Sequence, residues 1–157
     1  MRPKVYLETT VMSYLTGWLS RDLVTAAHQR LTREWWADHR ARFDLYVSQL
    51  VVQEAAGGDP GAASVRLEVI EGIEVLEITS AARDLAEQLV DGGIVPKKAD
   101  VDAMHISIAV TNGMDYLLTW NCAHIANAAM RLRIEDVCRA AGYSPPVICT
   151  PEELMEE

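Results

Sequence analysis

Two neighbouring stretches organise this chain: Lys98-Ala-Asp-Val-Asp-Ala-Met-His-Ile-Ser-Ile-Ala109 and, shortly after it, Asp115-Tyr-Leu-Leu-Thr-Trp-Asn121. The first is typical of a helix that carries an acidic residue near its start, and the second of a buried strand that ends on a polar side chain. Farther upstream, Glu8 and Glu54 also follow short apolar runs. We predict that these segments converge on one acidic pocket.

Short apolar runs alternate with longer helical patterns along the whole sequence. Strands are expected at residues 4–8, 43–47, 74–78, 116–119 and 147–149. Helices are expected at residues 9–17, 21–39, 48–57, 59–71, 80–92, 96–113 and 129–141, with a short terminal helix capped by Thr150. This alternation indicates an α/β domain with a mainly parallel sheet covered on both sides. In such sheets, ligands bind beyond the carboxyl ends of the strands.

Local patterns add detail to two of these helices. In the helix at residues 21–39, an apolar residue recurs at every fourth position, at Leu23, Ala27, Leu31 and Trp35. This spacing predicts an apolar stripe, the face by which a surface helix packs on a core. Ser80 is expected to cap the helix at residues 80–92.

Length and composition limit the class of protein. A chain of 157 residues, of which 50% are hydrophobic, is expected to form one ordered domain over residues 1–157. No apolar run reaches about eighteen residues, so no transmembrane helix is expected. Met1-Arg-Pro-Lys leads directly into a strand pattern, so we expect no secretory signal and a cytoplasmic protein. The cysteines show no metal-binding spacing and are expected to be reduced: Cys122, Cys138 and Cys149.

The formal net charge of −9 at pH 7 argues weakly against a nucleic-acid partner, because phosphates repel an acidic protein at long range. Contact is nevertheless decided by local basic patches. Three basic clusters occur in the sequence: Arg30, Arg33, Arg40 and Arg42; Lys97 and Lys98; and Arg131, Arg133 and Arg139. The alternative for each cluster is a solvated helix face, which is the commoner role of such charges.

Helix geometry distinguishes the two acids of the lead stretch. Successive residues of a helix turn by about 100°, so Asp100 and Asp102 lie on roughly opposite faces. Asp102 shares a face with His105, Ile106 and Ala109, the side expected to meet the sheet. Asp102 is therefore the better candidate ligand, whereas Asp100 suits the helix N-terminus. His105 is expected to be a hydrogen-bonded core residue in preference to a ligand.

Carboxylates gathered at one edge of a sheet suit a hard divalent cation. Mg²⁺ and Mn²⁺ prefer oxygen ligands and keep several waters, so two or three carboxylates suffice. Such a cation lowers the pKa of a bound water and neutralises charge that builds on a phosphate under attack. Carboxylates without a basic catalyst or a nucleophilic Ser or Cys fit metal-assisted phosphodiester hydrolysis, and a catalytic Cys122 is the less favoured alternative.

Over nearly its whole length the sequence resembles a PIN domain, the ribonuclease fold of VapC-like toxins in bacterial type II toxin–antitoxin systems. The family's strand-end acid followed by Thr or Ser is matched by Glu8-Thr-Thr, and its mid-chain helical Glu by Glu54. Its Asp-Ala-x-His-Ile-x-x-Ala segment is matched by Asp102-Ala-Met-His-Ile-Ser-Ile-Ala109, and its Thr-x-Asp strand end by Thr119-Trp-Asn121. The resemblance implies a three-layer α/β/α sandwich with a parallel five-stranded sheet. It also implies Mg²⁺- or Mn²⁺-dependent endoribonuclease activity on RNA, homodimers, and inhibition by a cognate antitoxin protein.

Carried over residue by residue, the resemblance implies four catalytic residues: Glu8, Glu54, Asp102 and Asn121. It implies that the three acids among them bind the metal. Thr10 and Thr119 match small hydroxyl residues beside the site. Two positions depart from the family: Glu8 is one methylene longer than the usual Asp, and Asn121 lacks a negative charge.

These departures leave two hypotheses open. The favoured one is an active variant, because three acids remain and an asparagine still offers an oxygen. The other is a catalytically weakened or inactive domain that binds RNA or a protein. Other phosphate-handling α/β modules fit less well, because the chain has no G-x-x-x-x-G-K-[ST] loop and no Asp-x-Asp after its first strand.

Overall fold

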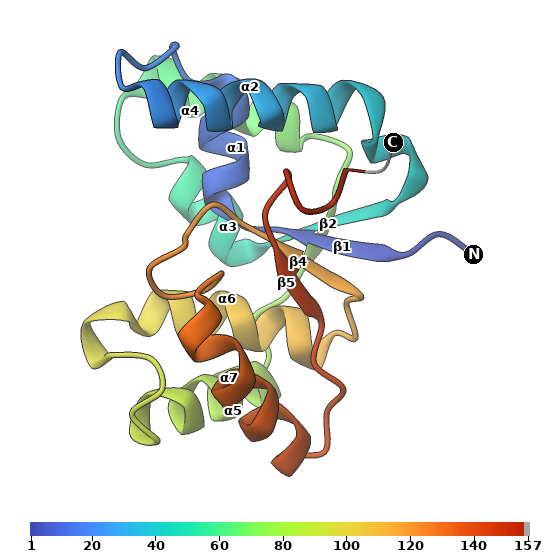
Figure 1. The fold of residues 1–157 in the computed structure, drawn as a ribbon, viewed down its shortest axis with the longest axis vertical. Helices are drawn as coiled ribbons and strands as arrows, with labels where there is room; N and C mark the ends of the chain where they lie inside the picture. The colour runs from blue at the N-terminus through green and yellow to red at the C-terminus, as the bar shows by residue number, and fades with distance from the viewer. Residues whose placement is uncertain (156–157) are drawn as a thin grey trace.

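The computed structural model describes residues 1–155 and shows a sheet of five parallel strands in the order β3-β2-β1-β4-β5 (Figure 1). The strands are β1 (Lys4–Leu7), β2 (Asp44–Ser48), β3 (Glu74–Leu76), β4 (Tyr116–Leu118) and β5 (Val147–Cys149). The central strand β1 pairs with β2 on one side and with β4 on the other. The parallel α/β sheet predicted from the sequence is confirmed.

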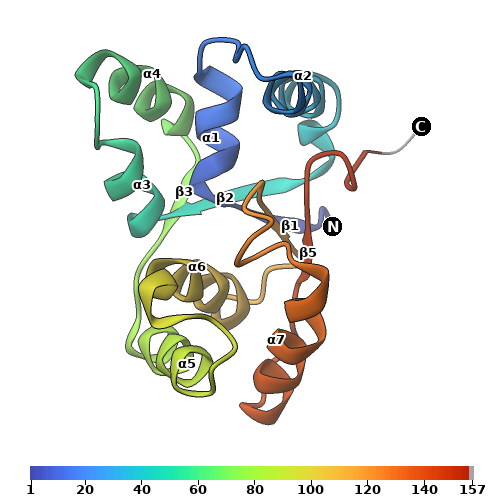
Figure 2. The same ribbon diagram turned by 60° about the vertical axis from the view of Figure 1, so that its left-hand side comes forward.

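Helices cover both faces of this sheet, as Figure 2 shows. On one face lie α1 (Thr9–Thr16), α2 (Leu23–Asp38) and α4 (Pro60–Ile70), and α3 (Gln49–Ala55) leads from β2 toward them. On the other face lie α5 (Ser80–Asp91), α6 (Asp100–Thr111) and α7 (Ala128–Ala140). Short 3₁₀ helices precede β2 and α6, at Arg40–Arg42 and Lys97–Ala99. Within residues 1–155, no helix combines the length and the hydrophobicity needed to cross a membrane.

The register of the strands determines where the chain leaves the sheet. Leu7 of β1 lies opposite Leu118 of β4, and Tyr6 lies opposite Tyr46 of β2. Because all strands run in the same direction, the residues that follow β1, β2 and β4 emerge at one edge of the sheet. Glu8, the helix α3 and Thr119 therefore start from the same edge.

The centre of the core is formed by β1 and β4 together with α6. Val5, Tyr6 and Leu7 are fully buried, as are Leu117 and Leu118. The helix α6 packs against α5 on one side and lies against the sheet on the other, so nearly every residue from 103 to 110 is buried. This position explains why the sequence of α6 is apolar on most sides and not along one stripe.

The ends of some elements differ from the sequence prediction. The first strand ends at Leu7, and Glu8 is the N-cap of α1, because its side chain accepts a hydrogen bond from the Thr10 amide. Thr79, not Ser80, caps α5. Its extended backbone lets its hydroxyl accept the Ala82 amide at 3.1 Å.

The terminal helix predicted after Thr150 is also wrong within the described residues. Thr150 and Glu153 do exchange the two hydrogen bonds of a capping box, at 3.1 and 3.3 Å. Residues 151–154 nevertheless form turns. The capping signal was correct, but up to residue 155 it is followed by a single turn, in which the Leu154 amide donates to the Thr150 carbonyl at 3.2 Å, and not by a helix.

The apolar stripe predicted for α2 is wrong over the first half of the helix. Leu23 and Ala27 are exposed, and the residues of α2 that are buried are Gln29, Thr32 and Trp35. Two of these three are polar, and both are hydrogen-bonded. Hydrogen bonding as well as hydrophobicity therefore decides which face of α2 turns inward.

Thr32 links α2 to the loop that follows β4. Its hydroxyl donates to the His28 carbonyl at 2.6 Å and accepts the indole N–H of Trp120 at 2.7 Å. The Trp120 ring is also stacked on His28, with ring centroids 4.1 Å apart, and lies close to Tyr14. These contacts hold Trp120 against the helices α1 and α2.

Replacing Thr32 with valine tests this link. Thr32→Val keeps the shape of the side chain but leaves the buried indole N–H of Trp120 without its acceptor, so the free energy of unfolding should fall by about 1–3 kcal/mol. Urea denaturation measures the loss. Thr32→Ser, which keeps the hydroxyl, should lose clearly less; an equal loss in both variants would show that the methyl group, and not the hydrogen bond, stabilises this position.

Candidate active site

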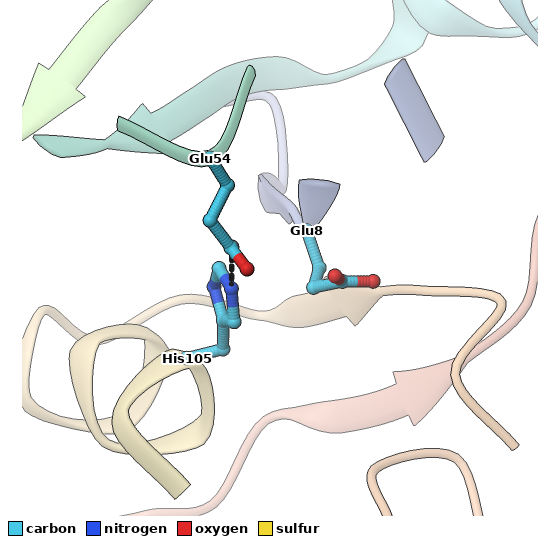
Figure 3. Close-up of side chains that lie close together, drawn as sticks. All are labelled: Glu8, Glu54 and His105. Carbon is cyan, nitrogen blue, oxygen red and sulfur yellow. Dashed lines mark hydrogen bonds and ion pairs between the residues drawn. The ribbon is translucent and has the colours of Figure 1, made fainter. Parts of the chain in front are cut away.

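Three side chains from separate elements meet beyond the carboxyl ends of β1 and β2 (Figure 3). Glu8 caps α1, Glu54 lies in the last turn of α3, and His105 lies on α6. One potential ligand atom of each lies within 4.8 Å of the other two. Glu8 and His105 are buried, whereas the Glu54 side chain is 37% exposed. The structure thus brings Glu8 and Glu54 together, and solvent reaches them on the Glu54 side.

Glu8 is held in place by two threonines from different elements. Its Oε1 accepts the hydroxyls of Thr10 at 2.5 Å and Thr119 at 2.6 Å, and its Oε2 accepts the Thr10 amide at 3.2 Å. Each hydroxyl also accepts a backbone amide of the loop after β4, from Trp120 and Asn121 respectively. The two hydroxyl residues that the sequence placed beside the site therefore orient the Glu8 carboxylate.

Glu54 is the end of a hydrogen-bonded chain that runs into the core. Its Oε1 accepts His105 Nε2 at 2.5 Å and the Thr9 hydroxyl at 2.6 Å. His105 Nδ1 lies 2.7 Å from the Tyr6 hydroxyl, which lies 2.8 Å from that of Ser48. Because an ionised carboxylate only accepts hydrogen bonds, we assign the donor directions Ser48 to Tyr6 to His105 to Glu54.

These contacts keep Glu54 ionised. Burial alone raises the pKa of the Glu54 carboxyl, but the hydrogen bonds that His105 and Thr9 donate outweigh it and bring the pKa below its ordinary value. Burial also raises the pKa of Tyr6 far above its usual range, so this phenol stays protonated and can serve as a donor. His105 is thus a buried hydrogen-bonding residue, as expected, and its two ring nitrogens are both occupied.

Asp102 does not belong to the group formed by Glu8, Glu54 and His105 in the described residues. It lies in the first turn of α6, where its Oδ2 is 3.1 Å from His124 Nδ1. Its side chain is 21% exposed, whereas its neighbour Asp100 is exposed as the helix geometry predicted. The three acids predicted from the sequence thus occupy two places: a pair of glutamates, and an aspartate paired with a histidine.

Asn121 uses its side chain inside its own loop. Its Oδ1 accepts the His124 amide at 3.1 Å, and its backbone carbonyl accepts the amides of Ile125 and Ala126. The oxygen that the sequence offered as a ligand is therefore already engaged in ordering this loop.

Sequence reasoning did not single out several residues of this site. Tyr6 lies within an expected strand and Ser48 at the start of an expected helix, although a polar hydroxyl within an apolar strand is a signal that a buried partner exists. Thr9 begins the helix expected at residues 9–17. His124 lies in a loop, and no periodicity or spacing marked it.

The oxygen donors present fit a hard divalent cation. Glu54 Oε2 and Asp102 Oδ1 accept no hydrogen bond from residues 1–155, while their other oxygens are anchored. Glu8 offers Oε2, which has only the long bond to the Thr10 amide. Anchored carboxylates with an oxygen to spare are ligands for Mg²⁺ or Mn²⁺, and the occupied nitrogens of His105 do not favour a nitrogen-seeking metal.

Removing the His105 ring should raise the pKa of Glu54. In His105→Leu the hydrogen bond that lowers this pKa is lost, while burial still raises it. The pKa is measured in metal-free protein by NMR titration of ¹³C-labelled glutamate carboxyls. His105→Gln, which can still donate toward Glu54, should show a smaller rise. An unchanged pKa in the leucine variant would contradict the donor role of His105.

Comparisons with known proteins bear on the architecture. No profile of a known protein family matches the sequence, and no curated protein matches it. Among solved structures, VapC20 of Mycobacterium tuberculosis, described as a toxin that cleaves the sarcin-ricin loop, is 16% identical and has a TM-score of 0.54, covering 88% of this chain and 95% of its own. VapBC2 of Rickettsia felis, bound to a DNA fragment from its promoter, is 11% identical with a TM-score of 0.52, covering 94% and 98%. The chain therefore has the fold of VapC proteins, the PIN-domain fold that its sequence resembles.

Proposed function

We propose that this protein is a metal-dependent endoribonuclease that hydrolyses RNA phosphodiester bonds, and that it acts as the toxin of a toxin–antitoxin pair. The observation that carries the proposal is the pair of glutamates, Glu8 and Glu54, anchored within 4.8 Å of one another at the carboxyl edge of the sheet. The description of VapC20 as a toxin that cleaves the sarcin-ricin loop supports it by analogy of fold.

Electrostatics favours a cation between these glutamates. Two unit negative charges about 5 Å apart repel by roughly 3 kcal/mol at an effective dielectric constant of about 20, and the exposure of Glu54 reduces this value. The low pKa of Glu54 means that the repulsion is not relieved by protonation at neutral pH. A divalent cation would relieve it, so the arrangement is suited to one.

In this proposal each residue has a definite task. Glu8 and Glu54 hold the cation, and Asp102 supplies a third carboxylate from α6. His105 and Thr9 keep Glu54 ionised and oriented, and Thr10 and Thr119 orient Glu8. Bound Mg²⁺ or Mn²⁺ supplies Lewis-acid stabilisation of a phosphate and a water of lowered pKa.

Most of the basic side chains whose contacts are described serve the fold. Arg33 donates to the carbonyls of Leu15 and Gly17 at the end of α1, and Arg40 lies over the ring of Trp36. Arg131 pairs with Glu153. We infer that RNA binding depends on few cations and on the metal, so affinity should be weak and should change little with salt concentration, because few counterions are released.

A cleavage assay tests the proposal. Purified protein should cut RNA with Mn²⁺ or Mg²⁺ and stop when EDTA removes the metal. Glu8→Gln and Glu54→Gln, which keep shape but lose charge, should each reduce the rate by at least about a hundredfold, more than the loss typical of residues that only support a ligand. Asp102→Asn should also lose activity. Cleavage that persists in Asp102→Asn would remove that residue from the mechanism, and cleavage that survives EDTA would contradict metal dependence.

The second candidate function is a weakened or inactive domain that binds RNA or a protein, and the neutral side chain of Asn121 favours it. Asn121→Asp distinguishes the two. An aspartate can still accept the His124 amide, so the loop should stay ordered while a negative charge is added. For an active nuclease, Mn²⁺ affinity and cleavage should rise by about tenfold, the lower end of what supporting residues contribute. No gain, together with no cleavage by the original chain, would favour the binding domain.

A protein partner of the antitoxin type is part of the same proposal, supported by the fold shared with the VapBC2 complex. Trp18 is 97% exposed in the connection between α1 and α2, and Leu19 and Val65 line adjoining grooves with it. An exposed apolar surface of this kind is typical of protein-binding sites.

The homodimer implied by the resemblance stays a prediction, which light scattering of the purified protein would check.

A further inference from the structure

The loop between β4 and α7 is tightly ordered by its own polar groups. The Asn121 side chain accepts the His124 amide, and the Asn127 side chain donates to the carbonyls of Cys122 and Ala123. Ile125, in the middle of the loop, is fully buried. The position of His124 is therefore determined by contacts on both sides of it along the chain.

This ordered loop presents His124 to Asp102. The ring nitrogen Nδ1 lies 3.1 Å from Asp102 Oδ2, and the two side chains are 31% and 21% exposed. Because an ionised carboxylate only accepts hydrogen bonds, Nδ1 is the donor. Half-buried contacts of this kind are stronger than the same contacts in open solvent.

The three acids that the sequence predicted share one arrangement. Glu8 has Oε1 anchored by two threonine hydroxyls, Glu54 has Oε1 anchored by His105 and Thr9, and Asp102 has Oδ2 anchored by His124. His105, Thr9, Thr119 and His124 are distant in sequence from the acids they contact, whereas Thr10 lies two residues from Glu8. His124 thus contacts Asp102 as His105 contacts Glu54: in each pair a ring nitrogen of the histidine is hydrogen-bonded to one carboxylate oxygen.

We propose that His124 is a positioning residue that orients Asp102 as the third carboxylate of the cation site. The inference rests on the proposed function and assigns a role to the loop that the neutral Asn121 orders. A ligand that is already held in one orientation loses less side-chain freedom when it binds a cation. The loop that begins at the neutral Asn121 thus positions another acid, Asp102, through His124.

Mn²⁺ binding to the full chain, measured by calorimetry without RNA, tests this role. His124→Leu removes the donor and should weaken Mn²⁺ binding by about tenfold or more, the effect typical of residues that orient metal ligands. His124→Asn places an amide nitrogen close to the position of Nδ1 and should restore most of the affinity. A thermal melt of each metal-free variant shows whether the fold is intact.

A double-mutant comparison shows whether His124 acts through Asp102. In an Asp102→Asn background, which retains Glu8 and Glu54, adding His124→Leu should change Mn²⁺ affinity by less than about twofold. Full affinity in His124→Leu alone, or an equal loss with and without Asp102, would overturn the positioning role. If the original chain binds no Mn²⁺ and Glu8→Gln changes nothing, the proposed function itself fails, and the role of His124 fails with it.

Discussion

A buried carboxylate at the end of the central strand is the constraint on which the rest of this structure depends. Glu8 is 4% exposed, and a charge so placed is tolerated only when hydrogen-bond donors surround it. Its donors come from α1 and from the residue that follows β4. Satisfying Glu8 therefore holds the sheet, the first helix and the loop after β4 in one arrangement before any ligand is present.

The same principle extends outward from Glu8 to the rest of the site. Glu54 is oriented by a chain of donors that begins at Ser48 in the core, and Asp102 is in contact with a histidine from an ordered loop. Each contact costs side-chain entropy, and like charges that lie near one another lower the stability of the fold further. Destabilising contacts gathered at one edge of a sheet are characteristic of functional sites, where proteins depart from the patterns that favour stability.

The likeness to VapC structures concerns the path of the backbone. At 16% and 11% identity, few side chains coincide, yet most of this chain is matched in each comparison. A parallel sheet with its helices in two layers gathers the strand ends at one edge regardless of the residues used. What this chain does there depends on its own acids and on the groups that orient them.

The sequence by itself determined the alternation of strands and helices, because hydrophobic periodicity and capping residues act locally. It also indicated Glu8 and Glu54 as residues of one edge, because Glu8 follows a strand and Glu54 lies in the helix after the next strand, and the family resemblance added Thr10 and Thr119. It could not determine which face of α2 turns inward, because that depends on hydrogen bonds to residues far along the chain, such as Thr32 to Trp120.

Only the tertiary structure decided how the acids are grouped and oriented. The placement of His105 between Tyr6 and Glu54 brings together three elements separated by dozens of residues, and no local pattern encodes such a contact. The pairing of Asp102 with His124 depends on the path of a loop, which has no periodicity to read. Side-chain contacts between distant segments are set by how the layers pack, and packing is a property of the whole chain.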